Sequence, residues 1–200
     1  MNPGPQPPWT AAVLAGGRST RMGRDKAFLP FPPRRLIDHQ VATLRALGPA
    51  ELLISGRPET DYAVAEARVV FDDVPDEGPL GGLIAVLAAA TTPLVLVLAV
   101  DMPAMTPAFL GRLLGGASPG VGVVPRCQGR WEPLAAVYPR GLLPRARCYR
   151  QEGSRALQPL LQAAAEAGAI LPLEVPAADA GILANLNSPT DLPPASTSWR

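Results

Sequence analysis

The stretch that most constrains the fold is residues 12–26, AVLAGGRSTRMGRDK, in which an apolar run ends at two adjacent glycines. Such a run is typical of a buried strand that leads directly into a loop. Glycines there let the backbone approach a ligand closely and point its N–H groups at an anion. The loop also carries three arginines and Lys26, opposed within it only by Asp25. The sequence therefore predicts a strand followed by a binding loop for a polyphosphate.

Lys26 is the only lysine of the chain, whereas arginine supplies the fixed positive charge everywhere else. A lysine ammonium is a compact point charge, and the planar guanidinium of arginine does not replace it. We therefore interpret Lys26 as a phosphate-binding cation, with Arg21 as a second one. The alternative interpretation of the loop is a solvated surface turn.

Two common phosphate-binding motifs do not fit this loop. In a P-loop, Gly-Lys is followed directly by Ser or Thr, whereas Arg24 and Asp25 separate Gly23 from Lys26 here. The dinucleotide fingerprint Gly-x-Gly-x-x-Gly does not match the glycine spacing either. The loop is therefore neither a P-loop nor a dinucleotide-binding turn.

Composition and charge limit the classes of partner. A chain of 200 residues is long enough for one domain with a substantial core. Its net charge of +1 gives no basic field of the kind that binds nucleic acid. No apolar run reaches membrane-spanning length, and residues 2–8 are proline-rich rather than apolar, so we expect a cytoplasmic protein without a membrane partner. Cys127 and Cys148 lack Cys-x-x-Cys spacing, which favours free thiols over a disulfide or a metal site.

Short apolar runs alternate with helical patterns along the chain. This predicts an α/β domain over residues 10–192, with a mostly parallel sheet, helices on both faces and flexible ends at 1–9 and 193–200. Two apolar runs joined by a polar turn within 121–138 predict a small antiparallel excursion. The predicted strands are 10–15, 51–55, 68–71, 94–100, 121–125, 131–138 and 170–175. The predicted helices are 38–47, 61–67, 83–90, 107–115, 142–150 and 154–167.

The first of these helices carries the only histidine. Asp38 is the expected N-cap, and His39 follows in the first turn. A histidine there is interpreted as an exposed helix residue, with a catalytic base as the alternative.

Aspartates follow two of the predicted parallel strands. Asp72 comes after the strand at 68–71, and Asp101 comes after 94–100, the most apolar strand. Ligands bind at this edge of open α/β sheets. Mg²⁺ takes one or two carboxylates when phosphates and water supply its other ligands, so Asp101 alone is sufficient as a metal ligand. The alternative for both aspartates is a capping role in a loop.

The loop residues resemble the signature of molybdenum cofactor guanylyltransferases, the MobA-type nucleotidyltransferases. The residues that carry the resemblance are Leu14, Ala15, Gly16, Gly17, Ser19, Arg21, Met22, Gly23, Asp25 and Lys26. It implies a single Rossmann-like nucleotidyltransferase domain. It also implies the transfer of GMP from GTP to the terminal phosphate of molybdopterin or its molybdenum-bound form, with release of pyrophosphate and with Mg²⁺, or Mn²⁺, as the metal.

In this reaction the residues take separate roles. The backbone of Leu14, Ala15, Gly16 and Gly17 would bind the nucleotide, Arg21 and Lys26 the triphosphate, and Asp101 the metal. The acceptor phosphate is already ionised at neutral pH, so no general base is required. By resemblance, Ser55 and Asp72 would contact the nucleoside, and Glu132, Asn185 and Asn187 would contact the acceptor.

Three alternatives remain open. Two are enzymes of the same superfamily, a CTP-dependent molybdopterin cytidylyltransferase and a sugar- or alditol-phosphate nucleotidyltransferase. Cytidylyltransferase relatives tend to have alanine at the position of Gly16, which favours GTP. The third is a nucleotide-binding regulatory module without chemistry, and the presence of both Lys26 and Asp101 argues against it. We expect a monomer, with other cofactor-biosynthesis proteins as further candidate partners.

Overall fold

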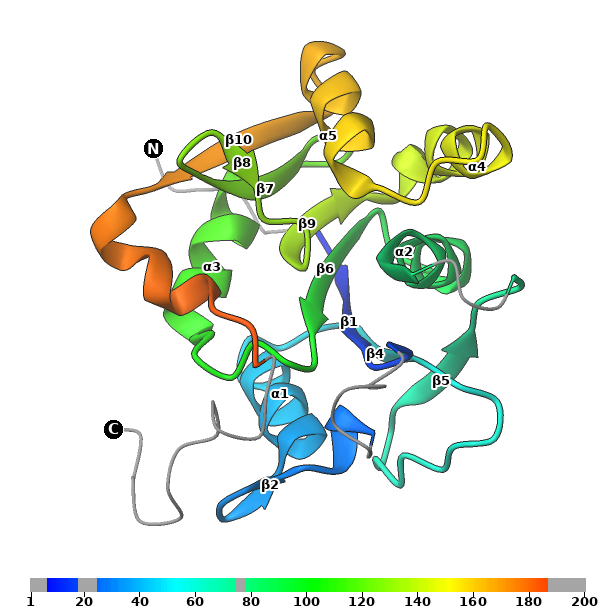
Figure 1. The fold of residues 1–200 in the computed structure, drawn as a ribbon, viewed down its shortest axis with the longest axis vertical. Helices are drawn as coiled ribbons and strands as arrows, with labels where there is room; N and C mark the ends of the chain where they lie inside the picture. Colours follow the sequence, from blue (N-terminus) through cyan, green and yellow to red (C-terminus); the bar gives the residue numbers. More distant parts are fainter. Residues whose placement is uncertain (1–6, 18–24, 75–77, 187–200) are drawn as a thin grey trace.

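The computed structural model describes residues 7–17, 25–74 and 78–186 (Figure 1). Within these ranges the strands of the main sheet are β1 (Trp9–Leu14), β4 (Glu51–Gly56), β5 (Arg68–Phe71), β6 (Leu94–Ala99), β7 (Gly122–Cys127), β8 (Arg130–Trp131), β9 (Ala135–Pro139) and β10 (Ile170–Val175). The short strands β2 (Pro30–Phe31) and β3 (Arg34–Arg35) pair separately. The α-helices are α1 (Leu36–Arg45), α2 (Gly78–Ala89), α3 (Pro107–Gly116), α4 (Leu143–Gln151) and α5 (Leu157–Glu166). The 3₁₀ helices are η1 (Lys26–Phe28), η2 (Arg140–Leu142) and η3 (Ala177–Leu183).

The described strands form a mostly parallel sheet in the order β10-β7-β9-β6-β1-β4-β5, with β8 paired to β7. β1 is an interior strand of this sheet and pairs in parallel with both β4 and β6. β9 is antiparallel to β6 and β7, as expected for the excursion within 121–138, whereas β10 is parallel to β7. The predicted α/β class with a mostly parallel sheet is confirmed.

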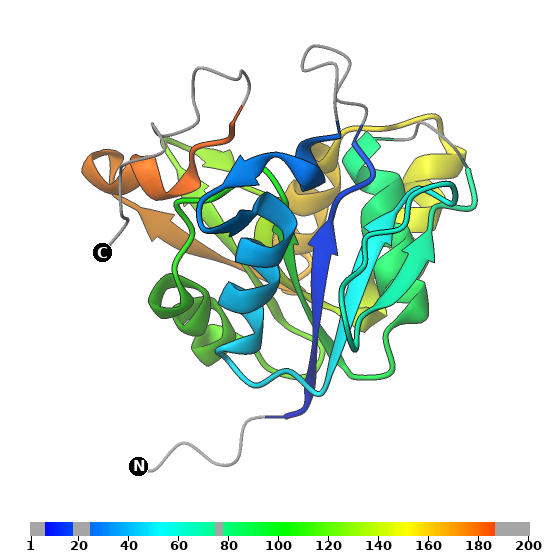
Figure 2. The ribbon, with the colours of Figure 1, turned by 90° about the horizontal axis from the view of Figure 1, so that it is seen from below.

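Helices cover both faces of this sheet (Figure 2). α1 and α3 pack on one face, and α2, α4 and α5 pack on the other. β6 shows why both faces are covered, because its leucines at 94, 96 and 98 join the first core and its valines at 95 and 97 join the second. A strand that is apolar on both sides is stable only between two layers of helix.

The parallel strands bring four chain segments to one edge. In the register of the sheet, Leu14 at the end of β1 lies beside Ser55 of β4 and Ala99 of β6. The end of β5 lies beside the end of β4, with Phe71 opposite Gly56. The segments that follow β1, β4, β5 and β6 therefore leave the sheet at the same edge, where α/β proteins bind ligands.

The predicted helix at 61–67 is wrong. Ala63 and Glu66 have φ values of 48° and 57°, which interrupt a right-handed helix, and the segment is irregular. Tyr62 holds it in place instead, since its buried ring stacks on Phe28 at 5.8 Å and its hydroxyl accepts a hydrogen bond from the Arg57 backbone N–H at 3.1 Å.

The predicted N-cap at Asp38 is also wrong, because α1 begins two residues earlier at Leu36, with Arg35 as its N-cap. Asp38 is the third helical residue. It accepts hydrogen bonds from the side chain of Arg35 at 2.7 and 2.8 Å and from its backbone at 3.4 Å. By contrast, the predicted cap of α3 is confirmed, with Thr106 accepting from the Phe109 N–H at 3.2 Å and Pro107 in the first turn.

The predicted domain boundary lies close to the first strand. β1 begins at Trp9, which is buried, one residue before the expected start of the domain at residue 10. Residues 1–6 and 187–200, which include the expected tail at 193–200, lie outside the described ranges.

Candidate active site

A lysine and an aspartate meet at the centre of this edge. Lys26, the first residue of η1, donates from Nζ to Oδ2 of Asp101 at 2.7 Å and to the backbone oxygen of Leu186 at 2.6 Å. Asp101 follows β6, and its own backbone oxygen accepts from the Leu186 N–H at 2.7 Å. The two charged side chains remain about one fifth exposed, at 19% and 20%. The pair is therefore fixed in position and still open to a ligand.

Asp25 orients the turn that carries this lysine. Its Oδ1 accepts from the Ala27 N–H at 3.0 Å and caps η1. Its Oδ2 is buried without a hydrogen-bond partner among the described residues. The carboxylate thus fixes the start of η1, and the position of Lys26 follows from that turn.

The end of β1 forms the floor beside the pair. Leu14 accepts from the Val100 N–H at 3.0 Å, and the Ala15 N–H donates to Ser55 at 2.8 Å, so neighbouring strands hold both residues. Gly16 and Gly17 are exposed, and a Cβ on Gly17 would meet nothing within 4 Å. The two glycines therefore present open backbone beside Asp101, as a phosphate-binding loop requires. Arg21 lies outside the described residues.

The side chain of Ser55 is buried and is not exposed at the edge of the sheet where Lys26 and Asp101 lie. It lies under α2, where a Cβ on Gly82 would come within 3.0 Å of its Oγ. Its backbone oxygen accepts a hydrogen bond from the Ala15 N–H, so Ser55 helps to fix the start of the loop that follows β1.

Asp72 lies at the same edge but away from the lysine–aspartate pair. β1 and β4 stand between β5 and β6, which separates the two strands by roughly 14 Å. Asp72 accepts from the Val74 N–H at 3.2 Å, and burial raises the pKa of its carboxyl, as does the neighbouring Asp73. An extended nucleotide could reach from Asp101 to Asp72, with the phosphates at one end and the nucleoside at the other.

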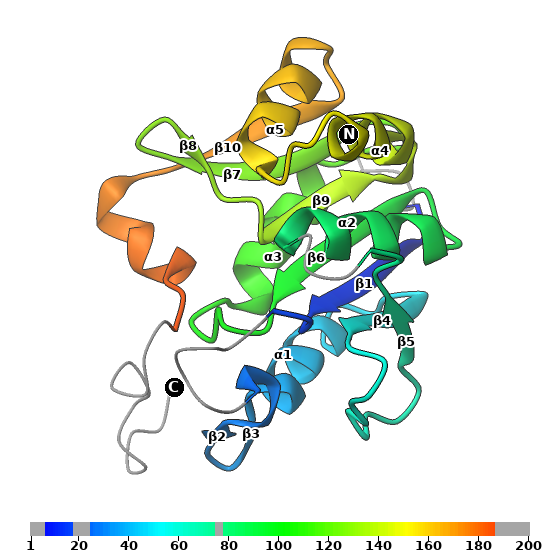
Figure 3. The same ribbon diagram turned by 45° about the vertical axis from the view of Figure 1, so that its right-hand side comes forward.

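The residues expected to contact the acceptor lie on the other side of Asp101. Leu134 accepts from the Ala99 N–H at 2.7 Å, which brings the segment with Glu132 to the end of β6. Burial raises the pKa of the half-buried Glu132, while the charge of Arg130 lowers it. Asn185 is exposed and directly precedes Leu186 (Figure 3 shows the chain returning through η3). Asn187 lies outside the described residues.

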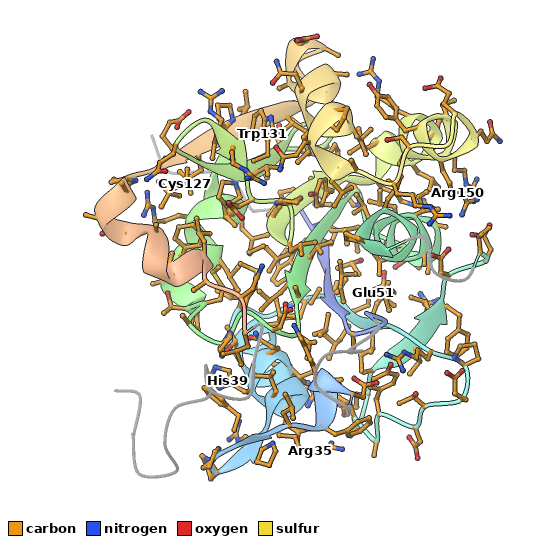
Figure 4. The ribbon with its side chains drawn as sticks, in the orientation of Figure 1. Arg35, His39, Glu51, Cys127, Trp131 and Arg150 are labelled. Atoms are coloured by element: carbon orange, nitrogen blue, oxygen red, sulfur yellow. The ribbon has the colours of Figure 1, made fainter. Side chains whose placement is uncertain are left out.

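His39 is half-buried, so its interpretation as an exposed helix residue is wrong. Its Nε2 lies 3.2 Å from the backbone oxygen of Pro103, and its ring packs against Phe31 at 4.7 Å (Figure 4). Burial lowers its pKa. His39 therefore supports the segment after Asp101, and none of its described contacts is with Lys26 or Asp101.

Sequence reasoning missed one buried support of the site. Gln40 on α1 is fully buried, and its amide donates to the backbone oxygens of Ala99 and Val100, each at 3.3 Å. These two residues directly precede Asp101. The available signal was a polar residue on the apolar face of a predicted helix, where burial requires a hydrogen-bond partner.

The fold and this edge together define a class of protein. An α/β sheet with a glycine-rich loop after an interior parallel strand, and a lysine–aspartate pair beside that loop, is the arrangement of a nucleotide-binding transferase. Comparison with known proteins agrees, since residues 11–168 match the sequence-family model described as the MobA-like NTP transferase domain. The chain belongs to the MobA-like NTP transferase family and is a nucleotidyltransferase.

Relatives cover nearly the whole chain. It is 38% identical over 183 residues to a probable molybdenum cofactor guanylyltransferase of Opitutus terrae, covering 90% of this chain and 91% of the relative. It is 38% identical over 188 residues to a molybdenum cofactor guanylyltransferase of Pseudomonas aeruginosa, covering 92% of each. The fold matches the crystal structure of molybdopterin-guanine dinucleotide biosynthesis protein A of Archaeoglobus fulgidus, with a TM-score of 0.71, 22% identity and coverage of 92% and 94%. The resemblance predicted from the sequence is confirmed.

The described residues lack two further features. None of their helices has the length and apolar character needed to cross a membrane. They contain no group of three or more His, Cys, Asp or Glu side chains placed to hold a metal ion.

Proposed function

We propose that this protein transfers GMP from GTP to the terminal phosphate of molybdopterin and releases pyrophosphate. The observation that carries the proposal is the partly exposed Lys26–Asp101 pair beside the open glycines of the loop after β1. The relatives named as molybdenum cofactor guanylyltransferases favour GTP and this acceptor over the cytidylyl and sugar-phosphate alternatives.

The transfer is a direct displacement. An oxygen of the acceptor phosphate forms a bond to the α-phosphorus of GTP, and the bond to the oxygen that bridges to the β-phosphate breaks. The acceptor is already ionised, so the protein is required to align the two groups and to stabilise the charge that moves onto pyrophosphate. Lys26 supplies a fixed positive charge for this, because Asp101 and the Leu186 backbone oxygen hold its ammonium in place.

The residues present fit a magnesium ion. Only Oδ2 of Asp101 is used by Lys26 among the described hydrogen bonds, so Oδ1 is available as an oxygen ligand. Mg²⁺ prefers oxygen ligands and commonly takes most of them from phosphate and water. We assign Asp101 as the residue that would hold Mg²⁺, with Mn²⁺ as the alternative ion. When bound, the metal supplies Lewis-acid neutralisation of the phosphate oxygens.

The remaining assignments follow from position. The backbone of Leu14–Gly17 binds the nucleotide, and Ser55 supports the loop that these residues begin. Asp72 contacts the nucleoside. Glu132 and Asn185 take the acceptor on the opposite side of Asp101. The roles of Arg21 and Asn187 remain predictions from the sequence, as do the cytoplasmic location, the monomeric state and the association with other cofactor-biosynthesis proteins.

The test is a transfer assay with molybdopterin, Mg²⁺ and each of GTP, CTP, ATP and UTP in turn. We expect pyrophosphate and a guanylylated product with GTP alone. Product with CTP instead would contradict the base assignment, and GTP binding without pyrophosphate release would indicate a regulatory module. Magnesium is tested in the same assay by chelation, which is expected to abolish transfer, and by readdition of Mg²⁺ or Mn²⁺.

A further inference from the structure

An arginine from the far half of the chain reaches the segment with Asp72. Arg150 lies in the last turn of α4 and is 77 residues from its partner Asp73. Its two terminal nitrogens donate to the two carboxylate oxygens of Asp73 at 2.5 and 3.1 Å. The same guanidinium lies 3.7 Å from Oδ1 of Asp72. One cation therefore joins both aspartates that follow β5.

The contact is partly buried and well defined. The Arg150 side chain is 15% exposed and that of Asp72 is 19% exposed, whereas Asp73 is 65% exposed. A bidentate arginine–carboxylate pair fixes orientation as well as distance, unlike a single contact between mobile surface charges. Asp73 thus binds the guanidinium through both carboxylate oxygens, and the more buried Asp72 lies 3.7 Å from one of its nitrogens.

The segment after β5 needs such a support. Among the described strands, β5 lies at the edge of the sheet and pairs with β4 only. Asp72 directly follows Phe71, the last paired residue of β5, and so lies beyond the pairing of that strand with β4. Burial and the carboxyl of Asp73 both raise the pKa of Asp72, whereas the hydrogen bond from the Val74 N–H and, to a smaller extent, the positive charge of Arg150 lower it. Arg150 supplies both a contact from the helical layer and a compensating charge.

We propose that Arg150 is a positioning residue that holds Asp72 ready to bind the nucleoside of the substrate. The inference rests on the nucleoside role proposed for Asp72, and it adds a residue of α4 to the determinants of nucleotide affinity. Arg150 acts through Asp72 and Asp73, not by touching the reacting phosphates. Its loss should therefore weaken nucleotide binding and leave the rate of the bound complex nearly unchanged.

The test compares four variants of the full chain, Arg150→Ala, Arg150→Lys, Asp72→Asn and the double variant Arg150→Ala with Asp72→Asn. The matched control is Arg147→Ala, since Arg147 is exposed on the same helix and has no described hydrogen bond or ion pair. Each protein is measured for the Kd of GTP with Mg²⁺, for KM and kcat in the transfer assay, and for thermal unfolding. Arg150→Lys replaces Arg150→Ala in these measurements if the alanine variant does not fold.

We expect Arg150→Ala to raise the Kd and KM for GTP about tenfold, with kcat changed less than about twofold, a size typical of residues coupled through one contact. Arg150→Lys should restore part of this affinity, and Arg147→Ala should match the wild type. The double variant should bind GTP no more weakly than Asp72→Asn alone, because both changes act on the same contact.

Three results would overturn the inference. They are an Arg150→Ala affinity equal to that of Arg147→Ala, a loss confined to kcat, or effects of Arg150→Ala and Asp72→Asn that add in full. Failure of the proposed function is distinguishable, because the wild type would then make no guanylylated product. The role of Arg150 would in that case be decided on the Kd of GTP alone.

Discussion

Substitutions of Lys26 and Asp101 give the sharpest prediction, because they should have different effects on GTP affinity and on turnover. Asp101→Asn keeps the shape of the side chain and an oxygen that can accept from Lys26, but it removes the negative charge. Lys26 keeps its bond of 2.6 Å to the Leu186 backbone oxygen. The ammonium therefore stays near the phosphates, and we expect the Kd for GTP to change less than about threefold, which is below 1 kcal/mol.

Turnover of Asp101→Asn should fall much further. The variant loses the charged oxygen proposed to hold Mg²⁺, and loss of one fixed electrostatic contact to the transition state typically lowers kcat by about 100- to 1,000-fold. This corresponds to about 2.7–4 kcal/mol in the activation free energy. Lys26→Ala removes a positive charge that both GTP and the transition state use, so its Kd should rise at least about tenfold and its kcat should also fall.

Both variants should fold, since each side chain of the pair is about one fifth exposed and the uncompensated charge remains accessible to water. The assay is steady-state transfer with GTP, molybdopterin and Mg²⁺, with Kd measured separately and circular dichroism as the control for folding. Wild-type turnover by Asp101→Asn would refute the metal assignment. Unchanged GTP affinity in Lys26→Ala would refute the assignment of this lysine to the triphosphate.

Three further predictions concern stability and base choice. Gly56→Ala should lower the free energy of unfolding by about 2 kcal/mol in urea titrations, because its Cβ would lie 2.3 Å from the buried ring of Tyr62; Gly115→Ala, whose Cβ meets nothing within 4 Å, is the control. Burial acts to raise the pKa of Glu51, but hydrogen bonds from Thr91, Thr10 and Arg68 outweigh it and hold the pKa below the ordinary 4.5. The stability from Glu51 is therefore present above that value and is lost as the pH falls through the lower folded pKa, so Glu51→Gln should flatten the decline measured between about pH 5 and pH 3. Gly16→Ala should lower the ratio of kcat/KM for GTP over CTP without lowering Tm, since its Cβ would sit at an ordinary 3.7 Å from Gly56; an unchanged ratio would contradict the role of Gly16 in base choice.

Local sequence patterns were sufficient to predict much of the fold. β6 is apolar at every position, and the apolar run that contains β1 is followed by two glycines, so both strands could be predicted and placed in the interior of a parallel sheet. The segment 61–67 failed because positive φ values at Ala63 and Glu66 depend on how the chain packs around Tyr62. That packing involves Phe28, which no local pattern connects to this segment.

The sequence predicted individual residues of the site, but it did not predict the contacts between them. The spacing of residues 12–26 predicted a cationic loop, and the position of Asp101 after a strand predicted a carboxylate at the same edge. Their direct contact depends on η1 and on the return of the chain to Leu186, which are tertiary features. The contacts of Arg150 with Asp72 and Asp73 likewise join segments that are far apart in the sequence, and no local sequence pattern predicts them.

The hydrogen bond from Lys26 to Leu186 has a consequence for biosynthesis, since it spans 160 residues. During translation, which adds about 5–20 residues per second, β1 and the loop after it leave the ribosome many seconds before Leu186. Through that interval the ammonium lacks the backbone oxygen of Leu186, and in its first part it also lacks the carboxylate of Asp101. The emerging chain therefore carries the loop sequence but not the assembled site, and the site is completed only after Leu186 has been synthesised.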